Sequence, residues 1–204
     1  MAEPAVARDW AAWAAELMSA RRTVMPRRLV EPGPDAGQRQ ALLAAAASAP
    51  DHRSLLPWRF ILVPQAQRAT LAEVFAQALL ERDASATPEQ LAQAREKAFR
   101  APLLMLVVVD GARGDPEVGL HERLLSAGCA VQNLLLMATA QGFGSALTSG
   151  KALGAAPLRR CFGLGPADHA LCFISVGTVS ASRPARARPA VADYVQTLGP
   201  GVMP

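Results

Sequence analysis

Apolar residues recur along this chain with two different periods, and the period separates predicted helices from predicted strands. Trp10, Trp13 and Leu17 share one face of residues 6–20, which predicts a helix there. Similar patterns predict further helices over residues 36–48, 65–82, 88–99, 117–141 and 155–162. Short apolar runs predict strands over residues 58–63, 103–110 and 170–179, and the middle run is apolar enough to be covered on both faces.

The segments between these elements, residues 21–34, 49–57 and 142–150, are predicted as loops. Residues 180–204 are predicted as a tail, because they lack a core pattern. Helices and strands mix without a regular alternation, which favours an α+β fold. The 204 residues fit a single domain that can bury a substantial core.

The predicted helix over residues 117–141 carries apolar or small residues on every face from 124 onwards. A helix of this kind must be covered on all sides. Its own domain could cover it, or one face could pack against a second copy of the chain, and we favour the dimer. Ser126, Gln132 and Asn133 interrupt the apolar run, which argues against a membrane span.

Composition excludes some classes of protein. Hydrophobic residues make up 51% of the chain and charged residues 19%, which favours a globule over a disordered chain. The net charge of +4 is modest, so we expect no nucleic-acid partner. Three cysteines without paired spacing, in a chain that shows no secretory signal, indicate reduced thiols and a cytoplasmic location.

Motifs for phosphate loops, nucleophile elbows and zinc proteases are absent from the sequence, and its three histidines lack metal-ligand spacing. Two polar segments are candidate sites instead. Arg21-Arg22-Thr23 ends the first predicted helix, and guanidinium groups next to a hydroxyl suit a phosphate monoester, although such a cluster can also be a solvated surface. In the second segment, Pro50 and Pro57 restrict a loop that displays His52, Arg53 and Ser54 to a polar ligand.

These segments resemble the flavin-dependent nitroreductases. The likeness begins with the Arg-Arg-Thr box after a first helix and the loop that ends in Pro-Trp-x-Phe. It continues in the same order through Ser126-Ala-Gly-Cys-Ala-Val131, Ala140-Gln-Gly-Phe-Gly144, Ser175-Val-Gly-Thr178 and Arg186-Ala-Arg-Pro189. It covers about residues 15–195 and points to the compact NAD(P)H nitroreductases of that family.

The resemblance implies a single FMN-binding domain over residues 1–204, with a core of about 15–195 and a tail of 180–204. It also implies a central mixed or antiparallel sheet flanked by helices, and an intertwined homodimer with FMN at the interface. Arg21, Arg22 and Thr23 would hold the FMN phosphate and ribityl end, and Arg186 and Arg188 would close the phosphate site. Leu147, Thr148 and Ser149 would lie beside the isoalloxazine ring.

Further positions follow from the same resemblance. His52 and Ser54 would reach the flavin from the partner subunit, and Ser48 occupies a cofactor position where compact relatives often carry arginine. The nicotinamide nucleotide would lie along Met137, Ala138, Thr139, Ala140, Gln141 and Gly142. No catalytic side chain is implied, because the hydride chemistry belongs to the cofactor.

The implied activity is an FMN-dependent NAD(P)H oxidoreductase. It would pass a hydride to nitro compounds, quinones or a similar electrophilic small molecule by a ping-pong mechanism. Two alternatives stay open. One is a non-enzymatic flavin-binding protein of the same fold, and the other is a basic protein whose arginines meet nucleic acid.

Overall fold

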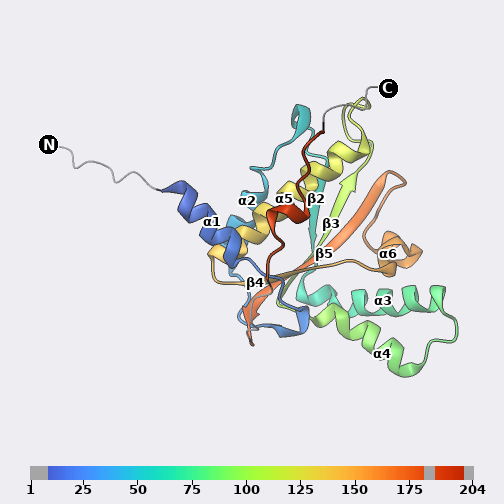
Figure 1. Ribbon diagram of the computed structural model, residues 1–204. Coiled ribbons are helices and arrows are strands. Elements are labelled where there is room, and N and C mark those ends of the chain that lie inside the picture. The colour runs from blue at the N-terminus through green and yellow to red at the C-terminus, as the bar shows by residue number, and fades with distance from the viewer. Residues whose placement is uncertain (1–8, 182–186, 200–204) are drawn as a thin grey trace.

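A computed structural model describes residues 9–181 and 187–199 of the chain (Figure 1). Its centre is an antiparallel sheet with the strand order β1-β5-β3-β2, and β4 also pairs with β5. The strands are β1 (Leu29–Val30), β2 (Trp58–Leu62), β3 (Leu103–Asp110), β4 (Gly144–Thr148) and β5 (Asp168–Val179). The helices are α1 (Trp10–Ala20), α2 (Ala36–Ala46), α3 (Arg68–Arg82), α4 (Pro88–Glu96), α5 (Leu120–Ala140) and α6 (Ala156–Cys161). The α+β prediction is therefore confirmed.

Strand β3 divides the core into two layers. Successive side chains of a strand point to opposite faces of the sheet. Met105 and Val107 pack on one face with residues of α2 and α5. The alternate residues Leu104, Leu106 and Val108 pack on the other face with α3, α6 and Phe173 of β5. This two-sided burial is what the continuous apolar run predicts.

Local signals place the helix ends close to the predicted positions. Asp35 and Gln38 form a reciprocal capping box at the start of α2, and Thr87 and Gln90 form another at α4. Each box satisfies backbone N–H groups that have no partner within the helix. Short 3₁₀ turns, η3 (Gln65–Gln67) before α3 and η4 (Lys97–Phe99) after α4, account for the remainder of those two predicted helices.

The prediction of loops over residues 142–150 and 21–34 is wrong in part. Strand β4 lies within the first segment, and β1 lies within the second. Gly144 is required there by packing, since a Cβ atom at this position would lie 2.6 Å from Val179 and 2.8 Å from Leu29. The small residues of β4 have weak strand preferences, so the pairing with β5 decides their conformation.

Apolar surface remains uncovered in the single chain. Helix α5 buries one face in the core, including Leu135, but Leu125 on its other face is 71% exposed. All residues of α1 are described and none is buried, with Trp13 55% exposed. The chain alone therefore does not cover α5 on all sides, and the homodimer stays a prediction. Among the described residues no helix is long and apolar enough to cross a membrane.

Candidate functional site

The arginine cluster, Arg21 and Arg22 with the adjacent Thr23, lies beside strand β4. Thr23 forms a parallel bridge with Ser145, and the backbone N–H of Val24 donates to the carbonyl oxygen of Ser145 at 2.9 Å. The segment that follows α1 therefore runs alongside β4, whose last residues lead to Ser149. This pairing brings the predicted phosphate end, Arg21 to Thr23, to the same edge as the predicted ring segment, Leu147 to Ser149.

The described part of the C-terminal tail reaches the same place. The Nη2 group of Arg188 donates to the carbonyl oxygens of Arg21 at 2.8 Å and Ser19 at 3.4 Å. A cation at the C-terminal end of a helix also interacts favourably with the helix dipole. Arg188 thus joins Arg21 and Arg22 in one basic cluster, whereas Arg186 lies outside the described residues.

A cavity of about 470 Å³ opens next to the end of β4. Thr148 and Ser149 line it, and Leu104, Phe173 and Ser175 contribute from the sheet. Its other walls are the α3–α4 hairpin and the 3₁₀ turn η5 (Lys151–Gly154). The volume falls within the range of small-molecule and cofactor sites.

Four cations line this cavity and were missed by the sequence reasoning: Arg82, Lys97, Arg100 and Lys151. They come from three regions of the chain, namely the end of α3, the η4 turn with the residue after it, and η5, so no local motif connects all four. One signal was available in the sequence, because residues 90, 93, 94, 97 and 100 recur at helical spacing and all line the cavity. Within the described ranges, the enclosed Nε group of Arg100 has no hydrogen-bond partner. A buried donor of this kind calls for an acceptor.

The loop with His52 and Ser54 lies elsewhere in the chain. Its last residue, Pro57, accepts a hydrogen bond from the N–H of Asp110, so the loop sits near the beginning of α5 (Figure 1). Strand β4 begins instead just after the other end of α5, and Thr23 pairs with it there. Helix α5 is about 30 Å long by its rise per residue. The single chain therefore does not bring His52 and Ser54 to the arginine cluster.

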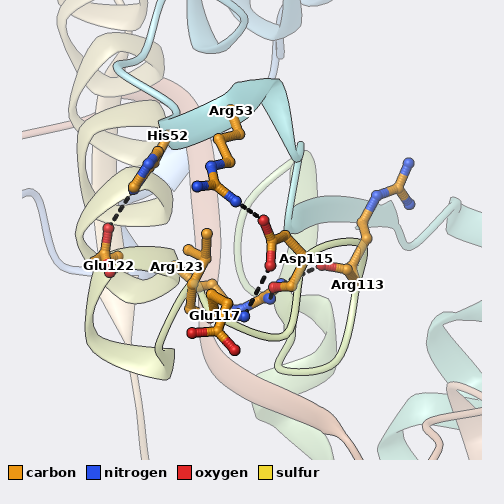
Figure 2. A network of polar contacts seen from close by, with 8 residues as sticks. His52, Arg53, Arg113, Asp115, Glu117, Glu122 and Arg123 are labelled. Atoms are coloured by element: carbon orange, nitrogen blue, oxygen red, sulfur yellow. Dashed lines mark hydrogen bonds and ion pairs between the residues drawn. The ribbon is translucent and has the colours of Figure 1, made fainter.

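Polar contacts hold this loop in an uncommon conformation (Figure 2). His52 Nδ1 lies 2.5 Å from Glu122 Oε2, and this hydrogen bond lowers the pKa of the Glu122 carboxyl. Arg53 forms an ion pair with Asp115. Arg53 and Ser54 both have positive φ angles, 56° and 51°, which non-glycine residues seldom adopt. The contacts explain how the loop keeps these angles and why His52 and Ser54 are displayed on the surface.

Arg123 organises the neighbouring segment that carries Asp115. Its side chain is buried, with 1% of its surface exposed. The guanidinium donates to the carbonyl oxygens of Val118 at 2.9 Å, Arg113 at 2.5 Å and Asp115 at 2.6 Å. A buried arginine thus fixes the segment that in turn holds Arg53.

The remaining predicted positions differ in accessibility. Ala138 is fully buried and Met137 packs against the core, whereas Ala140 and Gly142 are exposed at the turn after α5. In the single chain the most exposed residues of this segment are Ala140 and Gly142, whereas Met137, Thr139 and Gln141 are half-buried. Ser48 is exposed just beyond the end of α2.

Comparison with known proteins identifies relatives of this chain. A model of the nitroreductase family matches residues 18–178. The chain is 35% identical over 165 residues to the "Putative NAD(P)H nitroreductase YdjA" of Escherichia coli, covering 81% of this chain and 87% of that protein.

Solved structures share its fold. A nitroreductase-like family protein from Bacillus cereus superposes with a TM-score of 0.75 at 19% identity, covering 90% of this chain and 95% of the other. A "putative nitroreductase in complex with FMN" from Desulfovibrio desulfuricans superposes with a TM-score of 0.67 at 20% identity, covering 98% and 100%.

Proposed function

Because this chain belongs to the nitroreductase family, we propose that it is an FMN-dependent NAD(P)H oxidoreductase with a single flavin-binding domain. The relative from Escherichia coli is named as an NAD(P)H nitroreductase, and the structure from Desulfovibrio desulfuricans contains FMN. The observation that carries the proposal is the cationic cavity beside Thr148 and Ser149, at the end of strand β4, whose Ser145 pairs with Thr23 of the arginine cluster.

The chemistry of the arginine cluster suits the phosphate end of FMN. Arg21, Arg22 and Arg188 supply positive charge, and Thr23 supplies a hydroxyl group. Guanidinium groups bind phosphate oxygens through paired, charge-assisted hydrogen bonds. The bonds from Arg188 to the backbone of Arg21 would hold the two ends of the chain together around the phosphate. Arg186 lies outside the described residues, and its phosphate contact remains a proposal.

The cavity suits the ring system of the same cofactor. Thr148 and Ser149 are exposed and line it, and the neighbouring Leu147 is also exposed, so we propose that backbone groups of this segment meet a flat ring. The ring carries carbonyl oxygens, which would provide the acceptor that Arg100 Nε lacks. Lys97 lines the same wall, and positive charge beside the ring would favour its reduced, more negative form.

The proposed enzyme is a homodimer in which each site uses both subunits. His52 and Ser54 lie near the beginning of α5, too far from the arginine cluster of their own chain to share its flavin. We therefore assign them to the flavin of the partner, with Ser48 near the same interface. Exposed apolar side chains on α1 and α5, including Trp13 and Leu125, are suitable for the contact between subunits. The cytoplasmic location expected from the cysteines remains part of the proposal.

Bound FMN would supply the hydride chemistry, accepting electrons from NAD(P)H and passing them to an electrophile such as a nitro compound or quinone. The chain's residues would hold and orient the reactants. The segment Met137 to Gly142 is assigned to the nucleotide, with the exposed turn over residues 140–142 making the contact. Donor and acceptor would use one face of the ring in turn, which gives ping-pong kinetics.

The absorbance spectrum of the purified protein tests this function, followed by anaerobic titration with NADH and NADPH. We expect a flavin spectrum that either nucleotide bleaches, and parallel double-reciprocal lines at several acceptor concentrations. A flavin that neither nucleotide bleaches would indicate a flavin-binding protein without this activity. Intersecting lines would contradict the ping-pong mechanism.

The phosphate site is tested by the ratio of flavin to protein absorbance. Arg21→Ala removes a proposed phosphate contact and should lower the flavin content of the purified protein. Arg160→Gln removes one exposed positive charge on α6, away from the cavity lining, and should leave the flavin content unchanged. Equal flavin content in both variants would contradict the assignment of Arg21.

A further inference from the structure

The cavity is a groove with two distinct ends. Helices α3 and α4 form an antiparallel hairpin, so Arg82 and Asp83 at the end of α3 lie near the beginning of α4. Phe75, about two helical turns earlier in α3, lies toward the sheet, where the centroid of its ring is 5.6 Å from that of Phe173. The sheet end therefore contains Thr148 and Ser149, and the outer end contains Arg82.

The walls between these ends carry apolar side chains beside Gln90 and Gln93 of α4. Leu79 and Ala94 line the groove from the two helices of the hairpin, and Leu153 lines it from η5. Such walls favour the flat apolar body of an aromatic molecule over a strongly hydrated one. If the cofactor ring occupies the sheet end, the outer end is left for the molecule that meets the ring.

Three charged side chains, Arg82, Asp83 and Lys151, line the outer end and the η5 wall of the groove. Asp83 is the one carboxylate among the described residues that line the groove, and it is held by the N–H and hydroxyl groups of Ser85. These hydrogen bonds lower the pKa of Asp83, so it stays ionised beside Arg82. Lys151, on the η5 wall, adds a further positive charge. The three groups together leave about one unit of positive charge.

We propose that the outer end of this groove, around Arg82, binds the carboxylate of an aromatic acceptor substrate, with Lys151 adding positive charge from the η5 wall. The proposal rests on the proposed function, because it assumes that the ring of FMN lies at the sheet end. One unit of excess charge matches a carboxylate better than a doubly charged phosphate. The hydroxyl groups that would suit a phosphate, those of Thr148 and Ser149, lie at the other end of the groove.

Matched acceptors test this subsite. The ratio of kcat/KM for 4-nitrobenzoate to kcat/KM for 4-nitrobenzyl alcohol is measured in the wild type, Arg82→Gln and Lys151→Gln. Comparing ratios between variants cancels the intrinsic reactivity of the two compounds. We expect each substitution to lower the ratio by about three- to fivefold, as expected for a partly exposed ion pair. The control variant Arg160→Gln removes the same charge outside the groove and should leave the ratio unchanged.

Binding without turnover provides a second readout. Oxidised holoprotein is titrated with benzoate and with benzamide, and binding is followed by calorimetry. Benzoate should bind more tightly than benzamide in the wild type, and Arg82→Gln should remove most of this preference. An unchanged preference in Arg82→Gln would overturn the proposal, as would the same loss in Arg160→Gln.

Two outcomes separate this inference from the proposed function. If the flavin is reduced and the neutral acceptor turns over, but Arg82→Gln leaves the nitrobenzoate ratio unchanged, the subsite alone is refuted. If Arg82→Gln raises KM for NADPH and spares nitrobenzoate, the groove serves the nucleotide and the substrate assignment is wrong. A protein without reducible flavin refutes the proposed function itself, which the absorbance titration shows independently.

Discussion

Replacing Arg123 should destabilise the protein more than any single surface change. Its buried guanidinium makes three short hydrogen bonds, to the carbonyl oxygens of Val118, Arg113 and Asp115. Arg123→Met removes the donors and leaves these acceptors without their partner. Breaking a buried charged network costs about 3–5 kcal/mol, less than the sum of the separate bonds, because the segment can relax toward water.

The expected change in thermal stability follows from the size of the chain. For a protein of this length, each kcal/mol lowers Tm by about 2–4 °C, so Arg123→Met should lower it by roughly 6–20 °C. Arg113→Gln is the matched control, because the Arg113 side chain is exposed and donates from Nε to the carbonyl oxygen of Leu55. Its effect should stay within about 0.5–1 kcal/mol.

Circular dichroism melting and urea titration of Arg123→Met, Arg123→Lys and Arg113→Gln measure these differences. Lysine keeps the charge but cannot donate hydrogen bonds to several carbonyl groups at once as a guanidinium does. The Tm of Arg123→Lys should therefore lie between those of the wild type and Arg123→Met. Because the segment held by Arg123 also holds Arg53 through Asp115, Arg123→Lys should retain less flavin than Arg113→Gln. A Tm for Arg123→Met within about 2 °C of the control would refute the stabilising role, given the sensitivity above.

Three further outcomes are expected. Leu125→Glu adds a charge at an exposed position of α5, so it should yield a folded monomer by light scattering, and a dimer would show that this face is not the interface. Arg59 lowers the pKa of Asp168 through two hydrogen bonds of 2.8 Å, so Asp168→Asn should lower Tm by about 2–4 °C at pH 7. That gap should begin to close as the pH falls below the ordinary aspartate value of 3.8 and should vanish once the pH is below the lowered pKa of the folded carboxyl, and a constant gap would contradict the ion pair. Burial raises the pKa of the Cys172 thiol to about 11, and Cys161 is more exposed, so at pH 8 a thiol reagent should modify Cys161 before Cys172, as mass spectrometry of digests can show.

The arginines of this chain have a structural role that its net charge conceals. Arg68, like Arg123, is buried and donates to three backbone carbonyl oxygens, those of Val63, Ala98 and Pro102. Burial lowers its pKa from the usual arginine value. Part of the basic composition therefore supports loops inside the protein and is not available to an anionic partner.

Local patterns in the sequence determined most of the elements. The run over residues 103–110 is apolar without interruption, and the structure places a central strand there with the same bounds. The capping boxes at Asp35 and Thr87 are set by residues three positions apart, so they can be read from the chain directly. The order of short motifs along the chain also identified the family, because each motif is continuous in sequence.

Tertiary structure alone decided how distant segments meet. Strand β4 forms because β5 and the segment after α1 pair with it, and its own residues do not favour a strand. Glu122 meets His52 across 70 positions of the chain, and the cations of the groove come from three elements. Periodicity reports which face of one element is apolar, whereas register and packing determine which elements become neighbours. Contacts of this kind depend on the whole fold, so no local pattern could predict them.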